Sequence, residues 1–290
     1  MRYAAPATVD EAQTLLSDNP GSQVFAGATD LVPQIRAGRP SPSMVVDLKR
    51  IDRLTAVTHE GGQWTIGAAT PTADLTRNAE FTAAFPGLSE AAGLIGSDQI
   101  QNRSSLGGNL ANASPAADSV PALIANAGQA VIASGDGTRT VPASEIATGP
   151  GRTSLAEGEF IIEFTLDDPP AGTGDAYLRM IPRTEMDIAI VGAAVRLTIA
   201  DDTVSEATVV LGAVAPTAVS VPDAAAALVG ASLDGGGFDD ATLTAVADAA
   251  SAACNPIDDK RGTIAYRQQV AGVLAKRAAA VAAERAQNGA

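Results

Sequence analysis

Residues 104–125 form the stretch SSLGGNLANASPAADSVPALIA, in which small and polar side chains share a half-apolar segment. Gly107 and Gly108 stand side by side, and such a pair lets a backbone approach another group closely because glycine has no Cβ atom. Polar side chains that can hydrogen-bond to such a group lie in the same stretch: Ser105, Asn109 and Asp118. A glycine-rich loop that leads into a helix near the aspartate would explain the same residues without any ligand.

A second segment of this kind, FAGATDLVPQI, occupies residues 25–35. Its pattern predicts a strand that ends at a glycine and a short helix that follows. Such a turn uses glycine for its backbone angles, whereas N–H groups at the start of a helix are also suited to hold a phosphate. We interpret the two segments together as glycine turns that close on one elongated diphosphate ligand, with Asp118 accepting hydrogen bonds from sugar hydroxyls.

The charge balance and the scarcity of histidine and cysteine exclude several other kinds of site. With 33 acidic and 19 basic residues the chain has a formal net charge of −14, which repels nucleic-acid phosphates and predicts no nucleic-acid partner. One cysteine, Cys254, cannot form a disulfide within the chain or hold an iron–sulfur cluster alone. One histidine, His59, excludes a multi-histidine metal centre. Its place in VTHEGGQW favours an exposed strand-end residue over a catalytic base.

No segment reaches the roughly 18 consecutive apolar residues of a transmembrane helix, so we expect a soluble protein without a membrane span. The first residues, MRYAAPATVDEAQTLL, lack the apolar region of a secretory signal peptide. The expected compartment is therefore the cytoplasm.

The first part of the chain predicts alternating helices and strands. TVDEAQTLLSD has helical spacing and a cap at Thr8 or Asp10, and SQVFAGAT predicts a buried strand. DLVPQIRAG predicts a short helix and SMVVDLK a second strand. Hairpins are then predicted around Gly61-Gly62 and around Gly135-Asp136-Gly137, with helical stretches between them.

The later part begins with a strand over GEFIIEFTL and a linker at PPAGTG. DAYLRMI, IAIVGAAVRLTIADD and VSEATVVLGAVA predict three strands, and the alanine-rich remainder predicts helices. The fold class is therefore α+β. We expect one domain over residues 1–170, with lobes at about 1–55 and 56–170, and a second over residues 171–290 with a three-stranded antiparallel sheet and helices.

Four blocks of the sequence, in the same order, resemble the FAD-binding medium subunit of the molybdenum hydroxylase family, of the carbon monoxide dehydrogenase and xanthine dehydrogenase type. AGATDLVPQI and NRSSLGGNLANASPAAD are similar to its two flavin-binding motifs. YLRMIPRTEMDIAIVGAAV and DDKRGTIAYRQQVAGVLAKRA resemble its two C-terminal blocks. The resemblance spans nearly the whole chain. It implies a two-lobed FAD-binding domain of the vanillyl-alcohol-oxidase (PCMH) type.

The resemblance also implies roles for individual residues. Main-chain amides of the first motif would line the pyrophosphate, at Ala26, Gly27, Ala28, Thr29, Asp30 and Leu31. The second motif would approach the diphosphate and the flavin through Ser105, Gly107, Gly108 and Asn109, with Asp118 on polar groups of the ribityl or ribose portion. Ile161 corresponds to an aliphatic residue near the cofactor, Arg179 to a flavin-contacting lysine, and Asp187 to an acidic residue near the ring.

Three positions depart from the family pattern. Ala28 stands where a second glycine is common, which restricts the turn. Gln101 replaces an arginine, and Arg179 replaces a lysine, which keeps the charge but changes the donor geometry. No glycine fingerprint of the Rossmann type follows the first strand, so NAD binding of that kind is not predicted.

In function, the resemblance implies a non-covalent FAD-binding electron-transfer subunit with no catalytic residue or metal of its own. Electrons would come from [2Fe-2S] clusters on a small partner and a molybdenum cofactor on a large molybdopterin-binding partner, in a dimer of heterotrimers, and would leave to an external acceptor. A positive Arg179 or Arg183 near the flavin would favour the anionic reduced ring. Two alternatives stay open from the sequence: a self-sufficient flavin oxidase of the same fold, and a non-catalytic scaffold.

Overall fold

The computed structural model describes residues 1–39, 41–184, 186–233 and 237–289. Glu185, within the third of the four blocks, lies outside the described residues. The strands are β1 (Arg2–Ala4), β2 (Gln23–Phe25), β3 (Met44–Asp47), β4 (Val57–Glu60), β5 (Gln63–Gly67), β6 (Gln129–Ser134), β7 (Gly137–Pro142), β8 (Ala147–Gly149), β9 (Arg152–Thr153), β10 (Phe160–Asp167), β11 (Thr173–Met180), β12 (Val191–Ala200), β13 (Thr203–Gly212) and β14 (Val219–Ser220).

The helices are α1 (Val9–Asp18), α2 (Leu31–Arg36), α3 (Asp52–Thr55), α4 (Thr72–Arg77), α5 (Ala79–Ala84), α6 (Pro86–Gly93), α7 (Asp98–Gln101), α8 (Leu106–Ala111), α9 (Ser119–Ala125), α10 (Pro222–Leu228), α11 (Asp240–Ala252) and α12 (Ile264–Asn288), with short 3-10 turns η1 (Leu48–Arg50) and η2 (Ala143–Glu145). None of the described helices is long and apolar enough to cross a membrane.

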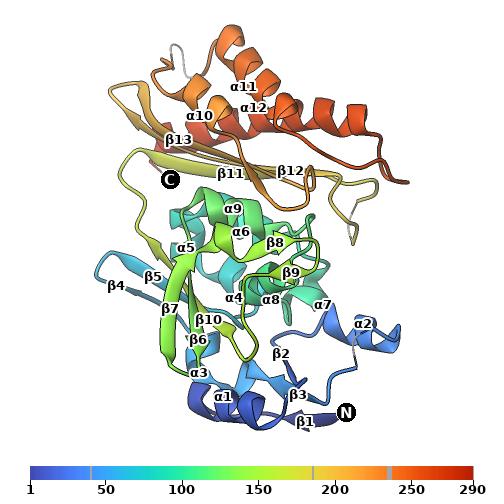
Figure 1. The fold of residues 1–290 in the computed structure, drawn as a ribbon. Coiled ribbons are helices and arrows are strands. Elements are labelled where there is room, and N and C mark those ends of the chain that lie inside the picture. The colour runs from blue at the N-terminus through green and yellow to red at the C-terminus, as the bar shows by residue number, and fades with distance from the viewer. Residues whose placement is uncertain (40, 185, 234–236, 290) are drawn as a thin grey trace.

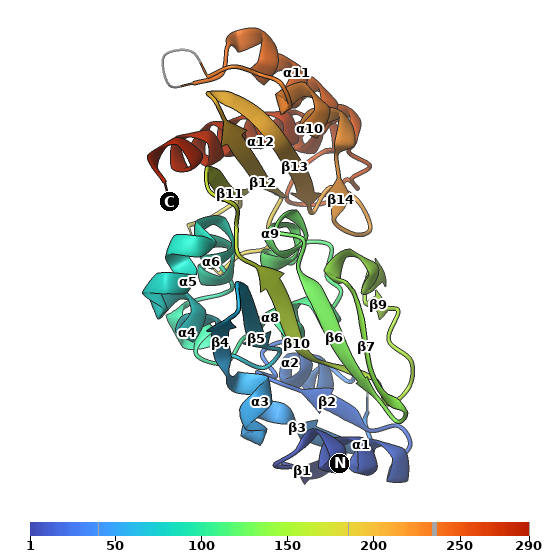
Figure 2. The ribbon, with the colours of Figure 1, turned by 90° about the vertical axis from the view of Figure 1, so that its left-hand side faces the viewer.

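The chain is stacked in three tiers, which Figures 1 and 2 show from two directions. The N-terminal tier holds the sheet β1–β3 with α1 and α2, and the middle tier holds the sheet β4–β5–β10–β6–β7 with the helices α3 to α9. The C-terminal tier holds the sheet β11–β14 with α10 to α12. Mixed α+β content agrees with the prediction.

The N-terminal tier is a small parallel sheet in the order β1–β3–β2. The central strand β3 is the buried one, with Met44, Val45 and Val46 in the core. The prediction of a buried strand over SQVFAGAT was wrong in this respect, because β2 lies at the sheet edge and is only partly covered. Thr8, and not Asp10, caps α1: its side chain accepts a hydrogen bond from the backbone N–H of Glu11.

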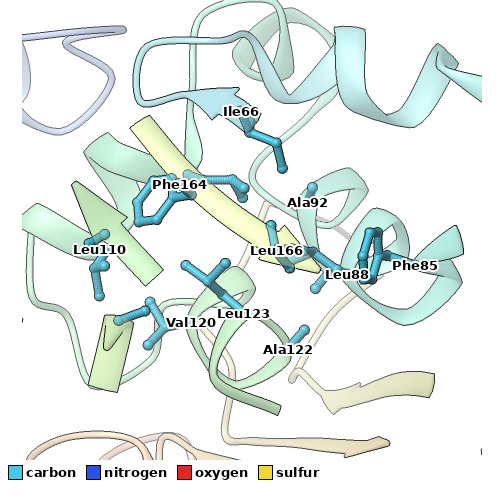
Figure 3. Packing of buried hydrophobic residues seen from close by; sticks show 14 of the residues in the cluster. Ile66, Phe85, Leu88, Ala92, Leu110, Val120, Ala122, Leu123, Phe164 and Leu166 are labelled. Carbon is cyan, nitrogen blue, oxygen red and sulfur yellow. The ribbon is translucent and has the colours of Figure 1, made fainter. Parts of the chain in front are cut away.

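The middle tier contains the two predicted hairpins, β4–β5 and β6–β7, joined through β10 into one antiparallel sheet. Its core packs α6 and α9 against this sheet, and Figure 3 shows Leu88 and Leu123 meeting Phe164 and Leu166 of β10. Burial of such side chains from water is the main source of stability here. This core therefore fixes α6 and α9, the helices that contact the C-terminal tier, on the sheet of the middle tier.

The C-terminal tier is an antiparallel sheet in the order β11–β12–β13–β14. The three predicted strands are β11, β12 and β13; the sheet also has a two-residue edge strand, β14, which is too short to give a pattern in the sequence. α12 packs across the sheet through small side chains, among them Ala275, Ala278, Ala279 and Ala282, all fully buried. The alanine-rich end is therefore helical, as predicted.

β11 contacts both α12 of its own tier and the middle tier, because successive side chains of a strand point to opposite faces. Ala176 and Leu178 belong to the core under α12, whereas Tyr177 belongs to the core of the middle tier. Asp175 accepts hydrogen bonds from the backbone N–H groups of Gly87 and Leu88 at the start of α6, at 2.8 and 3.2 Å. The strand thus joins the two tiers through alternating positions.

Candidate functional site

A cavity of about 330 Å³ lies between the N-terminal and middle tiers. Eleven of the fourteen residues predicted for the site line it, from three segments far apart in the sequence: Ala26, Gly27, Ala28, Thr29, Asp30, Leu31, Ser105, Gly107, Gly108, Asn109 and Ile161. α2 follows the first segment and α8 contains part of the second, and Gln34 of α2 is hydrogen-bonded to Asn112, the residue after α8. The structure therefore brings both glycine-bearing segments to one cleft.

The first segment offers a run of backbone N–H groups. Within the part of the chain that the structure describes, the N–H groups of residues 27–31 donate to no acceptor. The side chain of Asp30, at the N-cap of α2, makes no capping bond to them. Consecutive unpaired N–H groups at the edge of a cavity are an arrangement that holds anionic oxygens.

The backbone of this segment is shaped by two small residues. Ala28 has a φ of +59°, in the left-handed region that favours glycine. Gly27 is needed for a different reason, because a Cβ atom there would lie 2.0 Å from the carbonyl oxygen of Arg103. Gly27 is thus the point at which the N-terminal tier comes into contact with the segment before α8.

The second segment is a helix, and the prediction of a glycine turn there was wrong. Gly107 and Gly108 lie in the first turn of α8, where no left-handed backbone is required. Gly107 serves close packing, because its N–H donates to the Ala68 carbonyl at 3.1 Å and a Cβ atom would lie 2.4 Å from that oxygen. Gly108 donates its N–H to Ser105 Oγ at 3.1 Å and exposes its Cα on the cavity side.

A third wall of the cavity was not predicted from the sequence apart from Ile161. It contains Gly151, Leu155, Glu159 and Phe160. Arg139 forms a bidentate ion pair with Glu159 at 2.7 and 2.8 Å and holds the pKa of that carboxyl down to about 2. No lysine, arginine or histidine is among the described residues that line the cavity. The donors of its lining are therefore uncharged: main-chain N–H groups, side-chain amides, and the hydroxyls of Thr29, Ser104 and Ser105.

Gln34 and Asn112 also line the cavity and were missed. The Gln34 Nε2 donates to Asn112 Oδ1 at 3.2 Å, from α2 of the N-terminal tier to the residue that follows α8. No spacing in the sequence indicates this contact, because the two residues are 78 positions apart. Asn112 lies within the quoted segment of residues 104–125, and that position was the only available signal.

Asp118 and Arg179 meet each other and do not line the cavity in the described structure. Asp118 Oδ1 accepts from the Tyr177 hydroxyl at 2.9 Å, and Oδ2 accepts from Arg179 Nη1 at 2.7 Å. Burial raises the pKa of Asp118 to about 6, against the lowering by Arg179 and Tyr177. Asp118 and Arg179 are bonded to each other at the junction of the middle and C-terminal tiers. Their placement therefore lends no support to direct cofactor contacts.

Asp187 lies in the connection between β11 and β12, also outside the cavity lining. Its carboxylate is 2.7 Å from Arg183 Nε and 3.7 Å from Arg261 Nε, and Arg183 lowers the pKa of the carboxyl. Arg179 and Arg183 are each paired with a carboxylate. This pairing weakens the predicted Coulomb effect of either cation on a flavin.

Two other residues singled out in the sequence have structural roles. Gln101 donates from Nε2 to the carbonyl of Gly93 at 2.6 Å, which ties α7 to the end of α6. His59 stacks on Trp64 with ring centroids 4.4 Å apart and lies 2.8 Å from Asp168 Oδ1. His59 is a strand residue at a partly exposed position, outside the cavity lining.

Comparison with known proteins identifies the family of this fold and cavity. The sequence model described as "FAD binding domain in molybdopterin dehydrogenase" matches residues 1–167. The chain belongs to this family. A second model, "CO dehydrogenase flavoprotein C-terminal domain", matches residues 176–282. The chain is thus an FAD-binding flavoprotein subunit of the molybdenum-containing dehydrogenase type, and hence a component of an oxidoreductase.

Relatives cover the chain from end to end. The carbon monoxide dehydrogenase medium chain of Hydrogenophaga pseudoflava is 35% identical over 277 residues, which is 95% of this chain and 94% of that protein. The xanthine dehydrogenase FAD-binding subunit of Escherichia coli O157:H7 is 33% identical over 75% of each chain. A solved structure of the Hydrogenophaga pseudoflava carbon monoxide dehydrogenase matches with a TM-score of 0.92, 36% identity and 98% coverage of both chains.

The residues of the cavity fit a dinucleotide cofactor such as FAD. The N–H groups of residues 27–31 provide donors for phosphate oxygens without any cationic side chain. Leu31, Leu155 and Ile161 add apolar surface suited to the flat rings of such a molecule. Gly108 leaves room on the cavity side because it has no side chain.

Proposed function

We propose that this chain binds FAD non-covalently in the cavity between the N-terminal and middle tiers, with the diphosphate on the N–H groups of residues 27–31. The observation that carries the proposal is this run of unpaired N–H groups on residues that line the same cavity as Gly107, Gly108 and Asn109 of α8. Non-covalent binding is supported by the position of His59, which lies outside the cavity lining. The fourteen predicted site residues remain a prediction for cofactor contact, most strongly for the eleven that line the cavity.

The proposed role is electron transfer within a molybdenum hydroxylase. When bound, FAD would supply the redox chemistry for electron transfer between iron–sulfur clusters and an external acceptor. The residues of this chain hold and orient the cofactor: main-chain donors fix the phosphates, and Leu155, Phe160 and Ile161 exclude water from one wall.

The partners proposed are a large molybdopterin-binding subunit and a small iron–sulfur subunit, in a dimer of heterotrimers, acting in the cytoplasm. The chain has one cysteine and one histidine, so a partner must carry the clusters. We also propose a domain boundary at residues 170 and 171. It lies in the segment between β10 and β11, and the two family matches end and begin on either side of it.

The test is to purify the tagged full-length chain from its host together with any accompanying subunits, and to measure FAD released by acid per chain. We expect about one FAD per chain. Gly108→Val should lower this content strongly, because its side chain would enter the cavity while its Cβ meets only Ser105 Oγ, at 3.2 Å. Gly135→Val is the matched control, because no atom lies within 4 Å of a Cβ there.

Two results would contradict the proposal. The first is a folded chain that co-purifies with other subunits but contains no FAD. The second is Gly108→Val with the same FAD content as the unaltered chain. Molybdenum and iron in the same preparation would support the electron-transfer role, whereas a lone chain that oxidises a small alcohol would favour the self-sufficient oxidase.

A further inference from the structure

Asn109 has an orientation that its neighbours determine. It lines the cavity from α8, and its Oδ1 atom accepts two hydrogen bonds from Ser119 at the start of α9. The Ser119 hydroxyl is at 2.7 Å and the Ser119 backbone N–H at 3.3 Å. Because a backbone N–H only donates, the Asn109 atom that faces it must be the oxygen.

This arrangement directs the other end of the Asn109 amide away from Ser119. The Nδ2 group donates to no residue in the described ranges, and it is not among the buried polar atoms without a partner. Two N–H donors are therefore accessible on a residue of the cavity wall. Without the contacts to Ser119, the amide would be free to turn and present its oxygen instead.

The position of Ser119 is itself fixed from the C-terminal tier. Ser119 is 1% exposed and opens α9 directly after Asp118. Asp118 is held by the hydroxyl of Tyr177 and the guanidinium of Arg179, both on β11. The start of α9 is thus bonded to β11 through Asp118 and to Asn109 through Ser119.

We propose that Ser119 is a positioning residue, which holds the Asn109 amide so that Nδ2 donates to an acceptor oxygen of the bound cofactor. The inference rests on the proposed FAD site and extends it to a residue that does not line the cavity. The ligand class is a phosphate or carbonyl oxygen, because the donors are N–H groups and no cation accompanies them.

The experiment measures FAD affinity in the purified assembly after reversible removal of the cofactor. Ser119→Ala removes the hydroxyl bond to Asn109 Oδ1 at 2.7 Å and leaves only the longer backbone N–H bond at 3.3 Å. It should raise the Kd by about fivefold to tenfold, the effect of losing one hydrogen bond. Ser119→Cys, which keeps the packing but has a weak donor, should behave similarly, and Ser119→Thr, which keeps the hydroxyl, should restore affinity to within about twofold. Thermal unfolding of each variant shows whether the fold is intact.

A double-mutant cycle separates positioning from a general structural effect. If Ser119 acts through Asn109, adding Ser119→Ala to Asn109→Ala should raise the Kd no further. Asn109→Asp keeps an acceptor for Ser119 but replaces the donor with a negative charge, so it should weaken binding more than Ser119→Ala. An unchanged Kd in Ser119→Ala, or an equal effect of that change in the Asn109→Ala background, would overturn the inference. An unaltered chain without FAD would instead count against the proposed function.

Discussion

The cavity and the junction between the middle and C-terminal tiers use polar groups in opposite ways. In the cavity, the N–H groups of residues 27–31 have no partner among the described residues, and no cation lines the walls. At the junction, buried charged groups are paired: Asp118 with Tyr177 and Arg179, and Asp175 with backbone N–H groups of α6. Unpaired groups mark the place for a ligand, whereas paired buried charges join parts of the chain.

The largest effect is expected from a substitution that forces the two glycine-bearing segments apart. Gly27→Ala places a Cβ atom 2.0 Å from the Arg103 carbonyl oxygen, so the N-terminal tier must shift. We expect the free energy of unfolding to fall by about 3 kcal/mol, with loss of most of the bound FAD. Denaturant unfolding and acid-released FAD measure the two effects.

Gly135→Ala serves as the control for this change, because a Cβ atom there has open space. It should leave both quantities unchanged. Full FAD content in Gly27→Ala would show that residues 25–35 need not approach Arg103 for FAD to bind. The unpaired N–H groups of the cavity would then not mark the place for the ligand.

A smaller effect is expected from the pH dependence of the junction. Burial raises the pKa of Asp118 from its usual 3.8 to about 6, so the folded state holds its proton more tightly than the unfolded state. The contribution of Asp118 protonation to the free energy of unfolding is fully present below pH 3.8. It is lost as the pH rises through about 6. The rise in pKa corresponds to about 3 kcal/mol at most.

Asp118→Asn should therefore flatten the decline in unfolding free energy between about pH 4 and pH 6. Denaturant titrations at several pH values test this. Burial also raises the pKa of Asp175, so some slope should remain in Asp118→Asn, and Asp118→Asn combined with Asp175→Asn should be flatter still. An identical slope in Asp118→Asn and the unaltered chain would show that the junction does not titrate there.

The smallest effect concerns the backbone of the cavity. Ala28 has a φ of +59°, so Ala28→Gly should relieve strain and raise the free energy of unfolding by about 1 kcal/mol. Calorimetry should show this as a rise in Tm of about 2 °C. Ala127→Gly, at a φ of +54° away from the cavity lining, should stabilise similarly. A gain in Ala127→Gly alone would mean that Ala28 is not strained.

The sequence predicts local elements well where a pattern is long. The hairpins β4–β5 and β6–β7, the strands β11 to β13 and the helix α12 all follow from periodicity and glycine-bearing turns. β2 was placed in the interior because its residues are apolar, but a strand of three residues cannot show whether it lies at the edge of a sheet. Short elements such as β1 and β14 leave no periodic signal at all.

The site was predictable to the extent that its residues are contiguous. Residues 26–31 and 105–109 form two short segments whose glycines and polar residues indicate close backbone approach. Gly107 and Gly108 were placed in a turn that approaches a ligand, but both lie in the first turn of α8, where Gly107 packs closely against Ala68. Gln34, Asn112 and Ser119 could not be found from the sequence, since their roles depend on contacts between distant segments.

The alternation along β11 has a consequence for assembly of the native chain. Gly174, Ala176 and Leu178 lie toward α12, where a Cβ atom at Gly174 would strike the Ala282 carbonyl oxygen, whereas Asp175 and Tyr177 lie toward α6 and α9. A shift of β11 by one residue would place the Asp175 carboxylate against the buried alanine side chains of α12. The backbone N–H groups at the start of α6 would then lose their acceptor. Only one register of β11 is therefore compatible with docking of the C-terminal tier on the middle tier.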